Sequence, residues 1–233
     1  MMKPSTVATI AIGLLLGVQP YATVGQTPVA GPAATHNYAR WEKEISAFEE
    51  ADKKAPPEKG GVLFIGSSTI RLWKTLAEDF QGKNVVNRGF GGSAIEDSTH
   101  FADRIIFPYE PKQIFLRAGG NDIHDGKTPK EVAADFAEFV HTVRAKLPKT
   151  EILYIGLAPT RARWSEVDKG RELNRLIRTM ALDMPFVGYV DADEFTLGGP
   201  DGLPREELFV QDRLHFSPTG YQLFAARVRP FVK

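Results

Sequence analysis

Short apolar runs alternate along the chain with stretches whose apolar residues recur at helical spacing. Buried strands that are separated by helices indicate βαβ crossovers, and such crossovers join parallel strands. The expected strands span residues 61–66, 84–89, 113–119, 151–159 and 186–192. The sequence therefore predicts an α/β fold built around a five-stranded parallel sheet.

An amphipathic helix is predicted at residues 37–54, where Trp41, Ile45 and Phe48 lie at helical spacing with charged residues between them. We expect its apolar face to cover the sheet. Residues 192–216, in contrast, are rich in glycine, proline and charge and have no clear period. A loop of that length in a compact domain is usually functional.

A second helix is predicted over residues 128–148. Thr128 and Glu131 form a capping-box pattern with a proline in the first turn, and a Ser-Pro pair at 217–218 starts another helix near the C-terminus. Apolar residues share one face of the second helix, which should therefore pack on the sheet. They are Val132, Phe136, Phe139, Val140, Val143 and Leu147.

Composition and charge exclude several classes of partner and site. Lys plus Arg and Asp plus Glu each total 29 among 233 residues, so no net field would recruit nucleic acid or an anionic membrane. Cysteine is absent from the sequence, which excludes disulfides, a thiolate nucleophile and cysteine-ligated metals. A chain of this length that is 42% hydrophobic suffices for one compact core.

The N-terminal segment differs from the rest. Lys3 precedes an apolar stretch at residues 7–18, which is too short to span a bilayer and is typical of a secretory signal. We expect residues 1–25 to be a signal peptide, residues 26–36 a flexible mature N-terminus, and residues 37–233 a single domain. An uncleaved membrane anchor is the alternative. Cleavage would leave a secreted or periplasmic protein without stable membrane insertion.

Two adjacent serines follow the first predicted strand. In open parallel sheets, ligands bind beyond the carboxyl ends of the strands, where Gly66, Ser67 and Ser68 lie. Glycine permits a sharp turn there, and a serine that begins the next helix would lie where free N–H groups favour developing negative charge. The alternative is a serine that only caps the helix.

Polar and glycine-rich segments follow the next two strands. The segment at residues 87–97, NRGFGGSAIED, lacks the spacing of a dinucleotide fingerprint, which leaves a flexible turn or a backbone N–H that approaches a ligand closely. After the third strand, Asn121 and Asp122 stand beside two glycines. Asn and Asp are also ordinary turn residues.

A carboxylate and an imidazole complete the set of reactive groups. Asp212 precedes His215 by three residues in the long loop, and a turn can bring the carboxylate to Nδ1 of the imidazole, which leaves Nε2 as a base. A serine, a backbone N–H beside glycine, an amide donor and an oriented histidine are what acyl transfer to serine requires.

Metal and cofactor sites are not expected. Two acidic clusters could be imagined as ligand sets, but neither has the spacing of a zinc site or the glycine pattern of a calcium loop. Solvated loop charge is the favoured interpretation. The clusters are Asp122, His124 and Asp125, and Asp191, Asp193 and Glu194.

The four polar segments, in this order, resemble the four signature blocks of the SGNH hydrolases, also called GDSL esterases and lipases. The resemblance covers most of residues 61–229. It implies that Ser68 is the nucleophile and that Asp212 and His215 complete a catalytic triad. Ser67 stands where the family has its name-giving aspartate, which is not part of the catalytic set.

The same resemblance assigns the oxyanion hole and the fold. The backbone N–H groups of Ser68 and Gly92 and the side chain of Asn121 would stabilise the oxyanion, with Gly91 as the alternative to Gly92. The implied fold is a flavodoxin-like three-layer α/β/α sandwich with strand order 2-1-3-4-5. The implied activity needs no cofactor.

The expected function is hydrolysis of carboxylic esters through an acyl-enzyme on Ser68. We expect short acyl groups, acetyl foremost, on small molecules or carbohydrates. Alternatives are a lysophospholipase or thioesterase of the same family, and a non-catalytic member that binds a glycan or envelope component. Aromatic and basic residues near the triad are the candidate substrate contacts, although Trp164 could instead pack in the core. These candidates are Trp73, Phe90, Arg161, Arg163 and Trp164.

Overall fold

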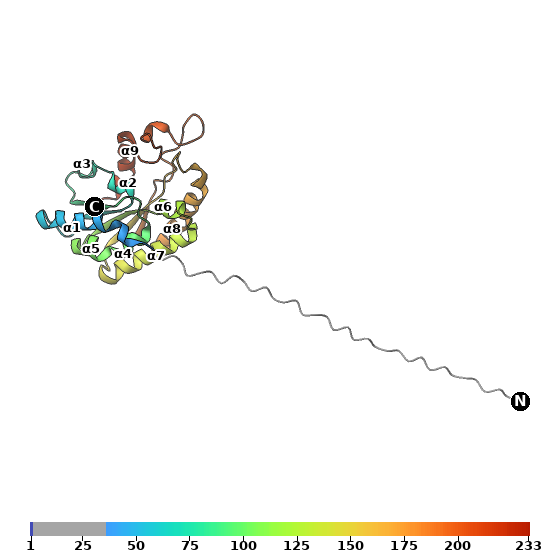
Figure 1. Ribbon diagram of the computed structural model, residues 1–233, viewed down its shortest axis with the longest axis horizontal. Coiled ribbons are helices and arrows are strands. Elements are labelled where there is room, and N and C mark those ends of the chain that lie inside the picture. Colours follow the sequence, from blue (N-terminus) through green and yellow to red (C-terminus); the bar gives the residue numbers. More distant parts are fainter. Residues whose placement is uncertain (2–35) are drawn as a thin grey trace. The chain divides into compact units, whose positions relative to one another are not determined.

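The computed structural model describes Met1 and residues 36–233. Within it, Asn37–Lys233 forms one compact unit, drawn in colour in Figure 1. The predicted signal peptide, apart from Met1, and the predicted N-terminal tail, apart from His36, lie outside the described residues. Those two predictions therefore stay predictions.

Five parallel strands form one sheet in the order β2-β1-β3-β4-β5. The predicted α/β fold and strand order are confirmed. Strands β3 and β4 end earlier than expected, because Gly119 takes a φ of 104° and the Leu157 N–H bonds to the side chain of Asn174 instead of a strand. The strands are β1 (Val62–Gly66), β2 (Val85–Gly89), β3 (Gln113–Arg117), β4 (Glu151–Ile155) and β5 (Val187–Val190).

Helices cover both faces of the sheet (Figure 1). On one face, apolar residues of α1, α4, α5, α7 and α8 pack with Leu63 and Ile65 of β1. On the other, residues of α2, α3 and α9 pack with Phe64, whose ring stacks on Phe115 at 4.8 Å. The helices are α1 (Glu42–Lys54), α2 (Ser68–Arg71), α3 (Leu76–Asp79), α4 (Ile95–His100), α5 (Ala102–Ile105), α6 (Gly120–His124), α7 (Pro129–Lys146), α8 (Val167–Asp183) and α9 (Pro218–Val228).

The predicted helix starts are present. At α7, the Thr128 hydroxyl accepts from the Glu131 N–H, and the Glu131 carboxylate accepts from the Thr128 N–H at 2.7 Å. At α9, the Ser217 hydroxyl accepts from the Gly220 N–H. These side chains satisfy backbone donors that have no partner within the first turn of a helix. The stripe of α7 is buried as expected, except that Leu147 is only partly buried.

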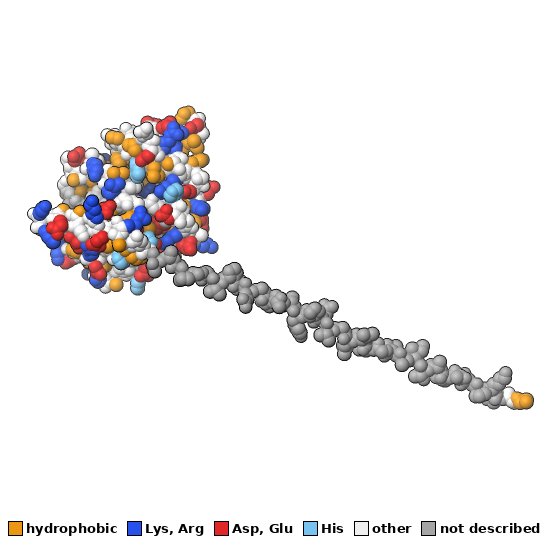
Figure 2. Space-filling view, in the orientation of Figure 1, with side chains coloured by type: hydrophobic (Ala, Val, Ile, Leu, Met, Phe, Trp, Pro, Cys, Tyr) orange, Lys and Arg blue, Asp and Glu red, His pale blue; other side chains and the backbone are white. Residues whose placement is uncertain are grey.

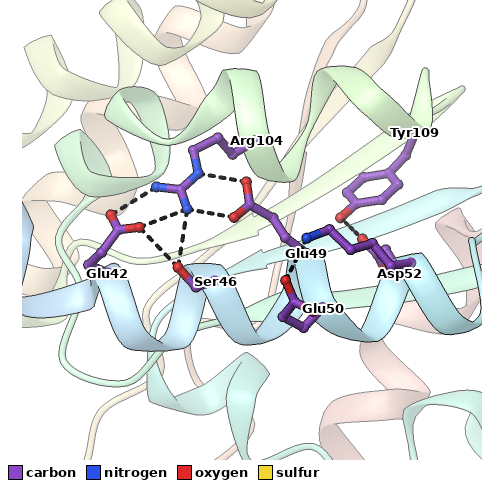
Figure 3. Close-up of polar contacts among 8 residues, drawn as sticks. Glu42, Ser46, Glu49, Glu50, Asp52, Arg104 and Tyr109 are labelled. Carbon is purple, nitrogen blue, oxygen red and sulfur yellow. Dashed lines mark hydrogen bonds and ion pairs between the residues drawn. The ribbon is translucent and has the colours of Figure 1, made fainter.

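Helix α1 is anchored by buried apolar residues and by ion pairs. Trp41, just before the helix, and Ile45 are buried. Figure 3 shows the Arg104 guanidinium between two carboxylates of α1, with its Nε 2.7 Å from Glu49 and its Nη1 2.8 Å from Glu42. Because these groups are partly exposed, the ion pairs mainly orient the helix.

The surface in Figure 2 carries acidic and basic side chains interspersed. That distribution agrees with the balanced charge of the sequence. Within residues 36–233, none of the helices combines the length and the apolarity needed to cross a membrane.

Candidate active site

The Gly66-Ser67-Ser68 turn leads from β1 directly into α2. Gly66 has a φ of 133°, and a Cβ there would lie 2.2 Å from the backbone oxygen of Arg117, so only glycine fits. The Ser67 N–H donates to that same oxygen at 3.0 Å. Ser68 is the first residue of α2, half-buried, with its side chain at the carboxyl edge of the sheet.

The second half of the site lies on the loop before α9. Arg213, between Asp212 and His215, has a φ of 58°, a left-handed conformation that is uncommon for a residue with a side chain. A β-bridge between Phe209 and Phe216 holds the two ends of this loop together. The long loop predicted to be functional thus ends in a constrained turn that presents a carboxylate and an imidazole.

A continuous chain of hydrogen bonds joins the serine, the histidine and the aspartate. The Nε2 of His215 is 2.9 Å from the Ser68 Oγ, and its Nδ1 is 2.6 Å from Asp212 Oδ2. Asp212 Oδ1 accepts from the N–H groups of Leu214 and His215, each at 2.9 Å. The arrangement allows His215 to take the serine proton while Asp212 holds the imidazole in place.

The environment of Asp212 keeps its carboxyl ionised. Burial alone would raise the pKa, but hydrogen bonds from the His215 side chain and from the N–H groups of His215 and Leu214 outweigh it and lower the pKa of Asp212 to about 2. Asp212 is therefore negatively charged throughout the neutral pH range.

The donors expected for the oxyanion hole are Ser68, Gly92 and Asn121. The Ser68 N–H and the Gly92 N–H have no acceptor among the residues that the structure describes. The Phe90 N–H donates to Gly66 O at 2.9 Å, which joins the turn that carries Gly92 to the serine turn. On the other side, Asn121 Nδ2 donates to the Ser93 carbonyl at 3.0 Å, and this leaves one amide hydrogen for a ligand.

Gly91 and Gly92 differ in their surroundings. A Cβ at Gly91 would lie 2.6 Å from Arg71 Nε, whereas one at Gly92 would lie 3.6 Å from its nearest neighbour, Arg40 Nη2. Gly92 has a φ of 75°, a conformation that side chains disfavour. Gly91 is thus needed for close packing and Gly92 for its backbone conformation. Both glycines stay candidates for the oxyanion N–H.

A pocket opens beside the serine. Its lining includes Ser68, Asn121, Leu157, Arg163, His215 and Phe216. Arg163 Nη2 donates to Asn121 Oδ1 at 2.9 Å. Because Asn121 accepts from Arg163 and donates to a backbone carbonyl, the plane of its amide is fixed in the pocket wall.

The predicted substrate contacts need correction. Trp73 and Phe90 are each 1% exposed and belong to the core, so neither forms the expected aromatic floor. The guanidinium of Arg161 bonds to Pro204 O and Asp201 and is not part of the pocket lining. Trp164 begins a short 3-10 helix, partly buried but also outside the pocket lining. Of the five candidates, Arg163 alone lines this pocket.

Arg117 is a pocket residue that the sequence analysis did not identify. It is the last residue of β3, and it belongs to the pocket lining although it is only 7% exposed. In the sequence, Arg117 is a basic residue at the carboxyl end of an apolar run, and this pattern could have indicated a pocket residue. Carboxyl ends of parallel strands are where ligands bind, so this position merited inspection.

Asp122 follows Asn121 in α6 and is not part of the pocket lining. Its Oδ1 accepts from the Ile95 N–H at 3.0 Å, its Oδ2 has no partner among the described residues, and it is 1% exposed. Burial raises the pKa of Asp122 to about 6. This carboxylate joins α6 to the start of α4, and its burial makes the ionised form unfavourable.

The stability of the fold should therefore depend on the ionisation of Asp122. Between about pH 4 and pH 6 the folded state retains a proton that the unfolded state releases, so stability should fall as pH rises through this window. Asp122→Asn removes this effect. The free energy of unfolding of Asp122→Asn minus that of the unmodified protein should therefore increase by up to about 3 kcal/mol between pH 4 and pH 7. Urea unfolding across this range measures it, with exposed Asp125→Asn as control; a pH-independent difference would contradict the assignment.

Comparison with known proteins identifies the family of the chain. The GDSL-like Lipase/Acylhydrolase family model matches residues 65–223. Subunit alpha1 of human platelet-activating factor acetylhydrolase IB is 25% identical over 193 residues, with 78% of each chain covered.

Solved structures share the fold. A protein of Streptococcus pneumoniae, described provisionally as a platelet activating factor, superposes with a TM-score of 0.72 at 22% identity, covering 84% of this chain and 94% of its own. A catalytic mutant of an acetylxylan esterase of Geobacillus stearothermophilus superposes with a TM-score of 0.59 at 15% identity, covering 74% and 94%. Since the family model spans more than half of the chain and its segments carry the geometry described above, the chain belongs to the GDSL-like lipase/acylhydrolase family, the SGNH hydrolases.

Proposed function

We propose that the protein is a serine esterase that removes short acyl groups, acetyl foremost, from small-molecule or carbohydrate esters. The observation that carries the proposal is the unbroken hydrogen-bond chain from Ser68 through His215 to Asp212. Such a chain activates a hydroxyl that is otherwise a weak nucleophile.

In the first half-reaction, Ser68 Oγ attacks the ester carbonyl carbon while His215 Nε2 takes its proton. The tetrahedral oxyanion would be stabilised by the N–H groups of Ser68 and Gly92 and by Asn121 Nδ2. The carbon–oxygen bond to the alcohol then breaks, and His215 returns the proton to the departing alkoxide. In the second half-reaction, water attacks the acyl-enzyme with His215 as base, which releases the acid and restores Ser68.

The composition of the pocket supports a short acyl group. Arg117, Arg163 and Glu166 are among its lining residues. A long alkyl chain packed against these groups would displace their hydration without replacing its hydrogen bonds, which is unfavourable. An acetyl group makes little such contact. Among the compared proteins, one is named as an acetylhydrolase and one as an acetylxylan esterase, in keeping with a small acyl group.

A panel of esters tests the proposal. We expect kcat/KM to be highest for 4-nitrophenyl acetate and to fall as the acyl group lengthens to butyryl and octanoyl, with acetylated xylose as the carbohydrate substrate. Higher kcat/KM for octanoyl ester, palmitoyl lysophosphatidylcholine or palmitoyl-CoA would favour the lysophospholipase or thioesterase alternative. Absence of turnover with every ester would favour the non-catalytic alternative.

A further inference from the structure

Arg117 is a nearly buried arginine whose backbone lies against the serine turn. Its backbone carbonyl accepts the Ser67 N–H at 3.0 Å, so the residue is tied to the segment that carries Ser68. Its side chain reaches the wall of the pocket that also contains Ser68 and His215. Arg117 is therefore a nearly buried residue that belongs to the lining of the catalytic pocket.

This guanidinium has no partner in the part of the chain that the structure describes. Its Nε is buried without a hydrogen bond, and none of its other nitrogens forms a hydrogen bond or ion pair with residues 36–233. Burial lowers the pKa of Arg117, yet an arginine stays protonated in proteins. A largely buried charge without a protein partner is unfavourable, which indicates a role that needs an anion.

Neighbouring carboxylates are already engaged. Glu166, which lines the same pocket, lies with its Oε1 2.7 Å from His124 Nδ1. Asp193, whose charge acts on Arg117, binds Tyr189 and also accepts from Arg178 at 2.7 Å. Both carboxylates, Glu166 and Asp193, are thus bound to residues other than Arg117.

A second guanidinium reinforces the positive charge. Arg163 uses its Nη2 to hold Asn121, while its Nη1 lies beside Gly120, 3.4 Å from where a Cβ would be. Arg171 also lines the pocket, with a side chain that is 44% exposed. The pocket lining contains three arginines, Arg117, Arg163 and Arg171, and one acidic residue, Glu166. Such a site attracts anions and can bind a carboxylate through paired N–H donors.

We propose that Arg117 and Arg163 form an anion-binding subsite within the catalytic pocket, which receives a carboxylate carried by the ester substrate. The inference rests on the proposed esterase function and narrows it to acidic esters. The carboxylate belongs either to the acyl half, as in a monoester of a dicarboxylic acid, or to the alcohol half, as in an acetylated hydroxy acid.

Matched substrates test the subsite and distinguish the two halves. For the alcohol half, 3-acetoxybenzoate is compared with neutral 3-acetoxybenzamide. For the acyl half, mono-4-nitrophenyl glutarate is compared with 4-nitrophenyl pentanoate, after subtraction of the rate with the Ser68→Ala protein. In one pair, kcat/KM should be about 10- to 100-fold higher for the anionic member, since a hydrogen bond to a charged group contributes that much. Ratios near one in both pairs would overturn the subsite.

The variant Arg117→Met keeps the apolar length of the side chain and removes the charge. It should bring the favoured ratio close to one, whereas Arg175→Gln, which removes an exposed arginine of α8, should leave the ratio unchanged. An undiminished ratio in Arg117→Met would contradict the inference. If the unmodified protein hydrolysed none of the four esters, the proposed esterase function would be wrong. The anion-binding subsite would then be tested by the binding of a carboxylate ligand.

Thermal unfolding provides that independent measurement. Glutarate or 3-hydroxybenzoate should raise the Tm of the unmodified protein and have little effect on that of Arg117→Met, because only a ligand of the folded state stabilises it. Without ligand, Arg117→Met should itself raise the Tm, by about 2 °C or more, since it removes an unpaired buried charge. A lower Tm for Arg117→Met, or equal ligand effects in the two proteins, would show that Arg117 is a structural residue instead.

Discussion

Replacing Ser68 with alanine is expected to lower kcat by about 10⁴- to 10⁶-fold on any ester that the protein hydrolyses, because no other group can form the acyl-enzyme. The Oγ of Ser68 is the atom that faces His215 Nε2 at 2.9 Å. The fold should be unaffected, since Ser68 is half-buried and its hydroxyl bonds only to His215 among the described residues. Ester hydrolysis and covalent labelling by a fluorophosphonate measure the loss.

The neighbouring serine provides a matched control. Ser67 is 8% exposed and precedes α2, and no hydrogen bond from its hydroxyl to the described residues is present. Ser67→Ala should therefore still react with the fluorophosphonate. Labelling that survives in Ser68→Ala but disappears in Ser67→Ala would reverse the assignment of the nucleophile.

Asp212→Asn should lower kcat by about 10⁴-fold. The N–H groups of Leu214 and His215 require an oxygen at the Oδ1 position, so the new amide would direct its NH₂ group at His215 Nδ1. Nδ1 must then accept a hydrogen bond, which places the imidazole proton on Nε2. An imidazole in that tautomer cannot take the proton of Ser68.

The rate and the pH dependence of hydrolysis by Asp212→Asn test this mechanism. Asp201→Asn is the control, because that carboxylate binds Arg161 on another loop and its loss should leave kcat near the unmodified value. An Asp212→Asn protein that retained more than about a tenth of the activity would show that Asp212 does not set the tautomer.

The elements of the fold could be predicted because their signals are local. An apolar run such as residues 62–65 specifies a buried strand on its own, and Thr128 with Glu131 marks a helix start within four residues. The triad residues could be located because chain order places Ser68 at a strand end and Asp212 three residues before His215. The resemblance to the SGNH blocks then assigned these residues to one catalytic triad.

The pocket wall could not be predicted, because it depends on which way each side chain turns after the chain has folded. Trp73 is near the nucleophile in sequence, but its ring packs 5.0 Å from that of Phe224 in the core, and its Nε1 donates to Asp79. Phe90 turns into the opposite core face and packs edge-on against Trp41. Arg117 reads in the sequence as the end of a strand, and only the sheet geometry brings it to the pocket.

The two halves of the triad are 147 residues apart in the chain, and this separation affects how activity develops during folding. Helices such as α7 form from local contacts, whereas closing a loop of this length costs entropy that must be recovered by later packing. The bond between Ser68 and His215 should therefore be among the last to form. Recovery of esterase activity after dilution from denaturant would report completion of the whole domain, later than the return of helical signal.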